Sequence, residues 1–215
     1  MGNWIATQLI ARGEDPTAIR VLDLQPPRQG LLDEGVVFIK TNVVDKTALS
    51  AAFAQPWPQT AAHLPLTVFH TAAVIRPAER HKSLLPYCTT VNVRGTRNVL
   101  EAAREAGADC FIATSSGSVG LRRPSFWIAP WESTPSRLVQ VLSDSATHQP
   151  KENDEFFGNY AISKAQAEAL VREADDAKSG FRTGCIRPAN GIYGIGGEAS
   201  ASLIRSYLTA GGVPT

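Results

Sequence analysis

Two side chains spaced four residues apart, Tyr160 and Lys164, can do chemistry together. On a helix, residues at this spacing share one face. An ammonium group beside a phenol stabilises the phenolate and lowers the pKa of the phenol toward neutrality. Such a phenol can exchange a proton with a carbonyl or alcohol oxygen at physiological pH. The spacing also occurs by chance in many helices, so the pair needs support from the rest of the chain.

Two further polar groups follow predicted strands. Ser116 lies just beyond the strand predicted over 109–114, and a hydroxyl at the carboxyl end of a strand in an open parallel sheet faces the ligand crevice. Asp23 lies at the end of the strand predicted over 19–24. Dinucleotide-binding folds place an acid there, which binds the ribose hydroxyls of NAD and repels the extra phosphate of NADP. The alternative is that both residues are ordinary turn formers.

The elements that must position these groups alternate between strands and helices. Short aliphatic runs predict strands over 19–24, 36–40, 66–72, 109–114 and 183–187. Helical periodicity predicts helices over 3–12, 46–54, the later half of 85–106, 160–174 and the start of one more over 203–210. This alternation predicts parallel strands with helices on both faces, the doubly wound α/β class.

One connection is far longer than the others. The stretch 121–156 is polar and rich in proline, and loops of this length are usually functional. We therefore expect a loop on the substrate side of the site. It holds Trp127 and Trp131, which predicts that part of it packs on an apolar surface.

Composition narrows the class of protein. A chain of 215 residues with 43% apolar and 19% charged content suits one globular domain. The net charge of +1, with scattered basic residues, disfavours nucleic acid and acidic membranes as partners. No apolar run reaches the ~18 residues of a membrane span, and the amphipathic N-terminus is unlike a signal peptide. The three cysteines, Cys88, Cys110 and Cys185, indicate free thiols in a reducing cytoplasm and no metal site.

Five motifs occur in a recognisable order. They are His70–Ala73 after a strand, Val91–Val99 opening a helix, Thr114–Ser116, Tyr160-x-x-x-Lys164, and Arg187–Gly194. In order and spacing the chain resembles the extended short-chain dehydrogenases/reductases of the NAD-dependent epimerase/dehydratase superfamily. It is most similar to the 3β-hydroxysteroid dehydrogenase and sterol-4α-carboxylate dehydrogenase branch of steroid metabolism, in its fungal form. The resemblance covers nearly the whole chain and implies a Rossmann-like, three-layer αβα domain over 1–215.

The resemblance implies hydride transfer between the nicotinamide of NAD, or less favourably NADP, and a carbinol carbon. Tyr160 would be the general acid/base, Lys164 would lower its pKa and hold the nicotinamide ribose, and Ser116 would hydrogen-bond the reacting oxygen. The positions that match cofactor contacts are Gly2, Asp23, Asn42, Val43, Ala72, Ala73, Asn92, Lys164, Pro188 and Ala189. Asn42 replaces the more usual Asp, and Asn92 has a structural role as its alternative.

The chain departs from the family pattern at both ends. The family begins with an apolar strand and a G-x-x-G-x-x-G turn, of which only the third glycine is matched here, by Gly2. The usual first strand is therefore expected to be lacking. It would lie between the strands that hold Asp23 and His70, so we expect two unpaired inner edges. Beyond Gly194 only a stub of the substrate lobe remains, so we interpret the chain as a fragment of a longer protein.

Three functions remain open. The first is an oxidoreductase acting on a secondary alcohol or ketone of a hydrophobic, sterol-like substrate. The second is nucleotide-sugar epimerase/dehydratase or dihydroflavonol-type reductase chemistry. The third is a paralogue without effective NAD binding, serving as a binding or regulatory module. We expect a cytoplasmic protein, membrane-associated only if a longer form carries a C-terminal anchor. The helices over 85–106 and 160–174 either pair across a homodimer axis or face only the sheet.

Overall fold

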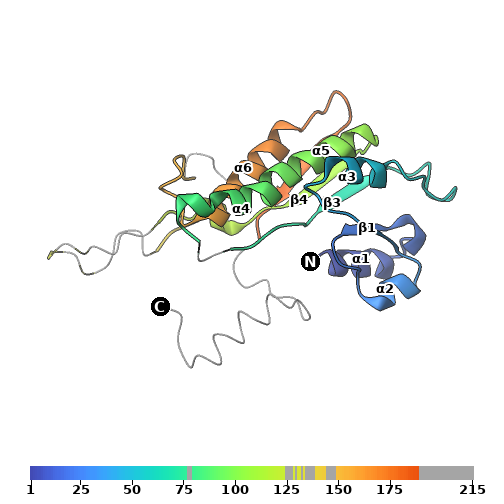
Figure 1. Ribbon diagram of the computed structural model, residues 1–215, viewed down its shortest axis with the longest axis horizontal. Coiled ribbons are helices and arrows are strands. Elements are labelled where there is room, and N and C mark those ends of the chain that lie inside the picture. Colours follow the sequence, from blue (N-terminus) through green and yellow to red (C-terminus); the bar gives the residue numbers. More distant parts are fainter. Residues whose placement is uncertain are drawn as a thin grey trace.

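The computed structural model describes residues 1–76, 79–123, 128, 130–131, 133, 139–143 and 149–188. The chain begins with α1 (Gly2–Ala11), β1 (Arg20–Asp23), α2 (Gln29–Asp33) and β2 (Val37–Lys40). It continues through α3 (Lys46–Phe53), β3 (Thr67–His70), α4 (Leu85–Thr89), a π-helical turn (Thr90–Gly95) and α5 (Thr96–Glu105). The last elements are β4 (Cys110–Thr114), α6 (Asn159–Glu173) and β5 (Arg182–Ile186), as Figure 1 shows.

All the paired strands run parallel, as the sequence predicts. Arg20 of β1 lies opposite Val37 of β2, while β4 pairs with β3 on one side and β5 on the other. The strands form two separate sheets, β1–β2 and β3–β4–β5. Within the described residues β1 and β3 are not paired with each other. The prediction that the strands holding Asp23 and His70 have unpaired edges is confirmed.

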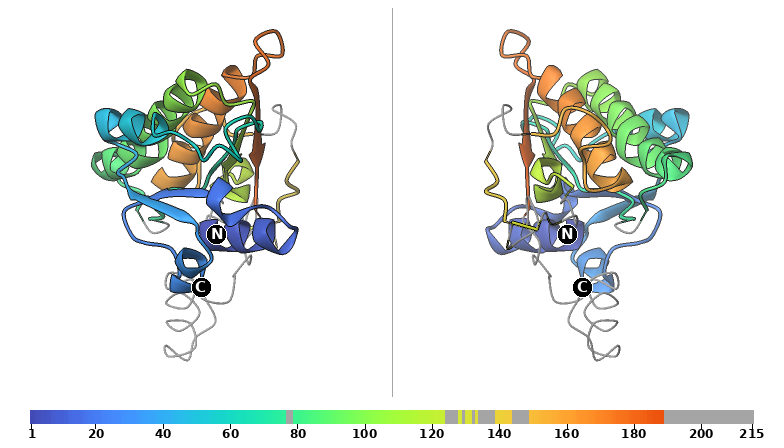
Figure 2. Two further views of the ribbon diagram at one scale, coloured as in Figure 1. Left: turned by 90° about the vertical axis from the view of Figure 1, so that its right-hand side faces the viewer. Right: turned by 90° about the vertical axis from the view of Figure 1, so that its left-hand side faces the viewer.

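The layers around the two sheets differ. The β1–β2 sheet is covered on both faces, because Val21 packs with Ala6 of α1 while the adjacent Leu22 packs toward the cluster of α3 and α5. The β3–β4–β5 sheet is covered by α5 and α6 on one face, as Figure 2 shows. Phe111 and Val171 are fully buried between these layers.

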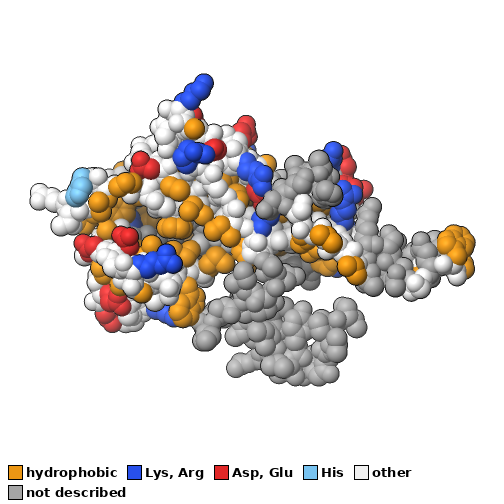
Figure 3. All heavy atoms as spheres, turned by 180° about the vertical axis from the view of Figure 1, so that it is seen from behind, with side chains coloured by type: hydrophobic (Ala, Val, Ile, Leu, Met, Phe, Trp, Pro, Cys, Tyr) orange, Lys and Arg blue, Asp and Glu red, His pale blue; other side chains and the backbone are white. Residues whose placement is uncertain are grey.

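The other face of the β3–β4–β5 sheet is open in the described part of the chain. Phe69 and Ile186 are exposed there, by 39% and 61%, and hydrophobic side chains gather on the side of the molecule that Figure 3 presents. The α/β class is confirmed. The expected helix cover of both faces is found at β1–β2 alone among the described strands.

The predicted helices that fall within the described residues are confirmed, with small changes in their ends. The helix expected in the later half of 85–106 runs from Leu85, where Pro86 sits in the first turn, a position that suits its missing N–H. Gly107, with a φ of 74°, follows the last helical turn, as predicted. The sequence analysis missed α2, whose five residues are too few to show a period.

The long connection over 121–156 is described only in part. Part of it packs on an apolar surface, as expected, because Phe156 is buried with Ala161 and Ile162, but Trp131 is 82% exposed and takes no part in this packing. Trp127 and the helix expected over 203–210 lie outside the described residues. Within the described ranges, no helix combines the length and apolar character that a bilayer crossing requires.

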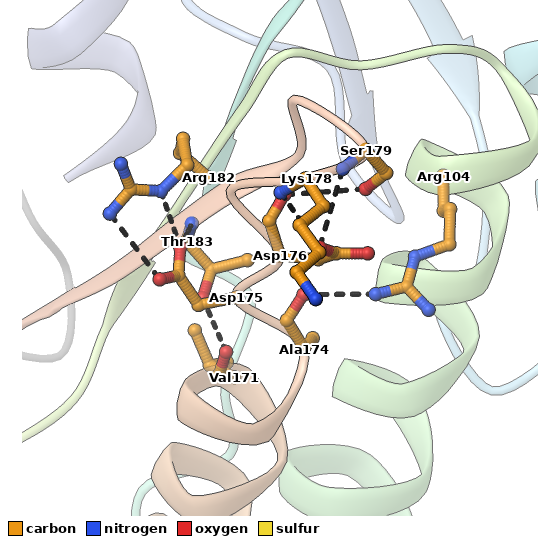
Figure 4. Close-up of polar contacts among 9 residues, drawn as sticks. All are labelled: Arg104, Val171, Ala174, Asp175, Asp176, Lys178, Ser179, Arg182 and Thr183. Carbon is orange, nitrogen blue, oxygen red and sulfur yellow. Dashed lines mark hydrogen bonds and ion pairs between the residues drawn. The ribbon is translucent and has the colours of Figure 1, made fainter.

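A polar turn joins the end of α6 to the start of β5 (Figure 4). The Asp175 carboxylate accepts hydrogen bonds from Arg182 Nε at 2.9 Å and from the backbone N–H of Thr183 at 2.8 Å. Arg104 of α5 donates from Nη2 to the carbonyl of Ala174 at 2.9 Å. These contacts fix α6 relative to β5 and α5 at the end of the sheet opposite to the candidate site.

Candidate active site

The three residues predicted to do chemistry meet at the carboxyl end of β4. Tyr160 and Lys164 lie in the first turns of α6, and Ser116 follows β4. The phenol of Tyr160 is half-buried, and the Ser116 side chain lies close enough to it to lower its pKa. Ser116 Oγ also accepts from the backbone N–H of Ser118 at 3.2 Å, which caps the short turn Gly117–Gly120. The Ser116 side chain is therefore oriented by the backbone of the turn that follows it.

The pKa of Tyr160 is raised above its ordinary value. Burial raises it most, the hydrogen bond with Ser116 lowers it, and the nearby Cys88 raises it further. The phenol is consequently protonated at neutral pH and is a proton donor. The sequence analysis expected Lys164 to lower this pKa, and the direction found here is the opposite.

Lys164 is directed to the end of β4. Its side chain is buried, and Nζ donates to the carbonyl oxygen of Thr114 at 2.7 Å. Burial lowers the pKa of Lys164 to about 8, against a smaller raising effect of Cys185. The ammonium therefore titrates near physiological pH.

A buried histidine lies behind Lys164. His70 Nε2 is 2.9 Å from Thr96 Oγ1, and Thr96 Oγ1 donates to the carbonyl of Asn92 at 2.6 Å. Because the Thr96 proton is used in that bond, His70 must be the donor through Nε2. Burial, and then the charge of Lys164, lower the pKa of His70 to about 3, so the imidazole is neutral. A small pocket between His70, Lys164 and Glu168 separates these groups.

Asn92 joins the segment after β3 to α6. Its Oδ1 accepts from the backbone N–H of Val74 at 2.8 Å, and its Nδ2 donates to the carbonyl of Val74 at 3.0 Å and to Ser163 Oγ at 2.9 Å. The amide sits in the π-helical turn, a feature frequent at functional sites. These contacts favour the structural role that the sequence analysis kept as an alternative for Asn92.

The start of α1 approaches the strand ends of the second sheet. A Cβ on Gly2 would lie 3.3 Å from Thr71 Oγ1, which is closer than most such contacts. Thr114 Oγ1 lies 3.4 Å from Met1 Sδ. Gly2 therefore lets the first turn of α1 come close to the carboxyl ends of β3 and β4.

Three other predicted positions line the same end of the sheet. Ala72 and Ala73 follow β3 directly. The carbonyl of Pro188, beyond β5, accepts from the backbone N–H of Gly117 at 2.8 Å, so it lies beside the segment that carries Ser116. Ala189 lies outside the described residues.

The remaining predicted positions lie in the first sheet. Asp23 is exposed at the carboxyl end of β1, and its Oδ1 accepts from a backbone N–H two residues ahead at 3.2 Å. Asn42 is exposed, with Oδ1 accepting from the N–H of Val44 at 3.0 Å. Val43 packs where a Cβ on Gly95 would come within 2.8 Å of its Cγ2. Asp23 and Asn42 thus present polar groups to solvent beside β1 and β2. Val43 instead packs against Gly95, in the π-helical turn before α5, and so connects the end of β2 to the helices of the second sheet.

The sequence analysis missed one charged residue of the site. Glu168 is 4% exposed and accepts from Ser115 Oγ at 2.6 Å, from Arg187 Nε at 2.9 Å and from Arg172 Nη2 at 2.8 Å. Burial raises the pKa of Glu168, but hydrogen bonds from Arg187 and Ser115 outweigh it and hold that pKa below its ordinary value. The signal was present, because Glu168 continues the four-residue spacing of Tyr160 and Lys164 along one helix face.

Parallel strands, alternating helices, and a Ser, Tyr and Lys at the carboxyl end of β4 define an extended short-chain dehydrogenase/reductase. Solved structures share this fold. UDP-glucose 4-epimerase from Thermotoga maritima superposes with a TM-score of 0.62 at 20% identity, over 98% of this chain and 60% of the epimerase. The enzyme from Thermus thermophilus, in complex with NAD, gives 0.60 at 23% identity, over 100% and 60%. At these identities the likeness concerns the fold alone.

Residues 1–213 match the 3-beta hydroxysteroid dehydrogenase/isomerase family, and the chain belongs to that family. A 3beta-hydroxysteroid-dehydrogenase/decarboxylase (isoform 2) of Arabidopsis thaliana is 32% identical over 207 residues, covering 90% of this chain and 31% of the relative. The human sterol-4-alpha-carboxylate 3-dehydrogenase, decarboxylating, is 29% identical over 194 residues, covering 90% and 42%. The chain thus spans less than half the length of these curated relatives.

Proposed function

We propose that this chain is the cofactor-binding and proton-transfer part of an NAD-dependent dehydrogenase acting on a secondary alcohol or ketone. The observation that carries the proposal is the half-buried Tyr160 phenol beside Ser116 at the carboxyl end of β4, with Lys164 one helical turn away on α6. The raised pKa keeps the phenol in its protonated form, which is the form that reduction of a carbonyl requires, but it also makes the phenol a weaker acid. In the oxidative direction the same site requires the phenolate.

Each residue takes a distinct role in the proposal. Tyr160 gives the proton to the reacting oxygen, and Ser116 supplies a second hydrogen bond to that oxygen. Lys164 holds the nicotinamide ribose and its ammonium stabilises the phenolate. In this structure Lys164 Nζ donates to the Thr114 carbonyl, and the two remaining N–H groups of the ammonium are available for that role. The lowered pKa of Lys164 records the cost of burying this charge with little compensation.

The residues present fit a dinucleotide. Gly2 allows close approach at the start of α1, where a Cβ would meet Thr71, and Asp23 offers an exposed carboxylate at the end of β1 for ribose hydroxyls. We assign Asn42 and Val43 to the adenine side, Ala72 and Ala73 to the pyrophosphate side, and Pro188 and Ala189 to the nicotinamide side, with Asn92 supporting them. When bound, the nicotinamide would supply the hydride chemistry, as NADH giving a hydride to a ketone or as NAD taking one from an alcohol. A carboxylate at position 23 favours NAD over NADP because it repels the extra phosphate.

The substrate class in the proposal is sterol-like. Its support is the family and the printed activities of the plant and human relatives, which are sterol-related. The described thiols are free, which supports a reducing, cytoplasmic location.

We further propose a homodimer in which α4, α5 and α6 pair across a two-fold axis. These helices lie together on the outer side of the β3–β4–β5 sheet (Figure 1). Light scattering on the purified chain tests this pairing, and a monomer mass at high concentration would contradict it.

The test begins with titration of NADH into the purified chain, followed by nicotinamide fluorescence, and continues with turnover of a 3β-hydroxysterol. Saturable binding is expected, and Tyr160→Phe should lower turnover by about 10²–10⁴-fold with NADH affinity unchanged. Tyr87→Phe is the matched control, because Tyr87 is 58% exposed on α4. Turnover that Tyr160→Phe leaves intact would refute the assignment, and the absence of binding to a folded chain would favour a non-catalytic module. Turnover of a UDP-sugar in place of the sterol would move the substrate class to nucleotide sugars.

A further inference from the structure

Glu168 is the point where three segments of the site meet. The carboxylate belongs to α6, two turns beyond Tyr160, and is 4% exposed. It accepts the Ser115 hydroxyl from the segment after β4 and the Arg187 guanidinium from the segment after β5. The side chain of Arg187 is itself only 11% exposed. A single buried carboxylate therefore holds side chains from both neighbouring strand ends.

The same two segments also exchange backbone hydrogen bonds. Ser115 N–H donates to the carbonyl of Ile186 at 2.8 Å, and Gly117 N–H donates to the carbonyl of Pro188 at 2.8 Å. Ser116, between the two donors, has an extended backbone with φ −154° and ψ 143°. These two backbone hydrogen bonds form a short ladder between the segment after β4 and the segment after β5, and Ser116 lies within it. Glu168 binds a side chain from each of the two segments, Ser115 and Arg187.

The placement of Glu168 on α6 connects this ladder to the phenol. Residues four and eight positions apart lie on one face of a helix, so Tyr160, Lys164 and Glu168 form a single row along α6. Tyr160 meets Ser116 at one end of the row, and Glu168 holds the residue before Ser116 at the other. The distance between the two hydroxyls thus depends on where Glu168 holds the segment after β4.

We propose that Glu168 is a positioning residue that holds Ser116 against Tyr160 by binding Ser115 and Arg187 together. The proposal rests on the function proposed above for Tyr160 and Ser116. Glu168 touches neither of them and acts through Ser115 and the ladder. An ion pair suits this task, because a planar guanidinium and a carboxylate fix direction as well as distance.

The opposite end of α6 is anchored independently. There, Asp175 binds Arg182 and Thr183, as Figure 4 shows. Loss of the Glu168 contacts should therefore loosen the ends of β4 and β5 at the site, while the far end of α6 stays attached to β5. This separation makes a local effect distinguishable from global unfolding.

The first measurement is amide hydrogen exchange in Glu168→Gln, which keeps the shape of the side chain and removes its charge. The amides of Ser115 and Gly117 should exchange at least tenfold faster than in the parent protein, and that of Thr183 should be unchanged. The matched control is Glu101→Gln, because Glu101 forms an exposed ion pair with Lys46 at 2.7 Å. The control should leave all three amides at their parental rates.

The second measurement is the ionisation of the Tyr160 phenol, followed by phenolate absorbance as the difference from Tyr160→Phe in the same background. Burial, Ser116 and Cys88 set this pKa, and the ammonium of Lys164 lies one turn away. Losing the Ser116 hydrogen bond should move the midpoint further upward. Unfolding would instead move it down toward the ordinary value, so the direction separates positioning from loss of fold.

Ser115→Ala serves as the second variant, should Glu168→Gln fail to fold. It keeps the buried ion pair and removes only the hydroxyl that reaches Glu168, so the same two changes are expected at smaller size. Parental exchange at residues 115 and 117, together with an unmoved phenol midpoint, in a folded Glu168→Gln protein would overturn the proposal. Neither hydrogen exchange nor phenol ionisation requires turnover. A failed sterol assay alone would therefore contradict the proposed activity but would not contradict the positioning role of Glu168.

Discussion

The two sheets of the molecule differ in the size of their buried apolar clusters and in the burial of their polar groups. The region of α1, β1, α2 and β2 has a small cluster of buried side chains, Ala6, Leu31 and Val36. The region of β3, β4, β5 and the helices α3, α5 and α6 has a larger one centred on Phe111 and Val171. The second region also contains buried polar groups, among them Lys164 and Glu168, whereas Asp23 of the first is exposed.

This difference suits the second region to proton transfer and the first to contacts with the adenosine end of a dinucleotide. Proton transfer needs groups whose pKa values are shifted by burial and whose positions are fixed, and only the second region has the packing to provide both. Contacts to the adenosine end of a dinucleotide need accessible polar groups at strand ends, which a thin region can supply. The predictions below test whether stability, ionisation and binding divide along this line.

The largest effect is expected from Phe111→Ala. Phe111 is fully buried in the main cluster, so truncation should lower the free energy of unfolding by about 3–5 kcal/mol. Leu31→Ala, in the small cluster, should cost about 2 kcal/mol, at the lower end for a buried leucine. Urea denaturation followed by circular dichroism measures both. A larger loss in Leu31→Ala than in Phe111→Ala would reverse the comparison.

The next effect is a pH dependence due to Lys164. Burial lowers its pKa to about 8 from 10.5, so between these values the unfolded chain binds more protons than the folded one. The free energy of unfolding should therefore rise as pH rises from 8 to 10.5, by about 3 kcal/mol at most from this group. Lys164→Met should lack this rise in urea denaturation at a series of pH values.

Cys185 affects the pH dependence of the unfolding free energy in the opposite direction above about pH 9. Burial raises the pKa of Cys185 to about 11, so its contribution to stability falls as pH rises above about 9. Because Lys164 and Cys185 shift each other's pKa, comparing Lys164 with Met in a Cys185→Ala background isolates Lys164. Parallel curves for the parent protein and Lys164→Met would show that the lysine is not held in a buried, costly position.

A smaller effect is expected where the two regions touch. A Cβ on Gly95 would come 2.8 Å from Val43 Cγ2, so Gly95→Ala should destabilise the protein by about 1–3 kcal/mol through overpacking. Val43→Ala should recover part of that loss in the double variant, with a coupling of about 0.5–3 kcal/mol in a double-mutant cycle. If the free-energy changes of Gly95→Ala and Val43→Ala simply add in the double variant, the two residues are not in steric contact across the two regions.

The smallest effect on folding, and the most specific on binding, is expected from Asp23→Asn. Asp23 is exposed, so stability should stay within about 0.5 kcal/mol. NADH affinity should fall roughly tenfold, and the preference for NADH over NADPH should narrow. Asp33→Asn, an exposed acid at the end of α2, is the control and should change neither. Equal affinity in Asp23→Asn and the parent protein would remove Asp23 from the site.

The elements were largely readable from the sequence. The strand predicted over 36–40 is found at Val37–Lys40, and the helix predicted over 160–174 at Asn159–Glu173. Aliphatic runs and helical periods report on burial along one element, and burial is what defines these elements. Division of the strands into two sheets also followed, because the motif order left a gap between the strands holding Asp23 and His70.

The parts that could not be read depend on neighbours distant in the chain. The direction of the Tyr160 pKa shift reflects burial and Ser116, and the sequence gives no measure of how deep a phenol lies. Lys164 contacts the Thr114 carbonyl, a group present at every position of a chain. The link from Glu168 to Arg187 joins residues whose pairing no periodicity reveals, although the row Tyr160, Lys164 and Glu168 was visible.

The parallel pairing of β4 with β5 has a consequence for synthesis on the ribosome. Cys110 pairs with Arg182, so the outer edge of β4 stays uncovered while the whole segment between them emerges. Loop closure over such separations slows folding, and open strand edges are prone to association in the meantime. Arg187 lies just beyond β5, so the more buried of the two counter-charges of Glu168 arrives with the last strand of the described sheet. The nascent chain therefore carries a bare strand, and a Glu168 carboxylate with Arg172 as its counter-charge but without Arg187, until the residues around 187 have left the exit tunnel, which is the interval in which a chaperone would matter most.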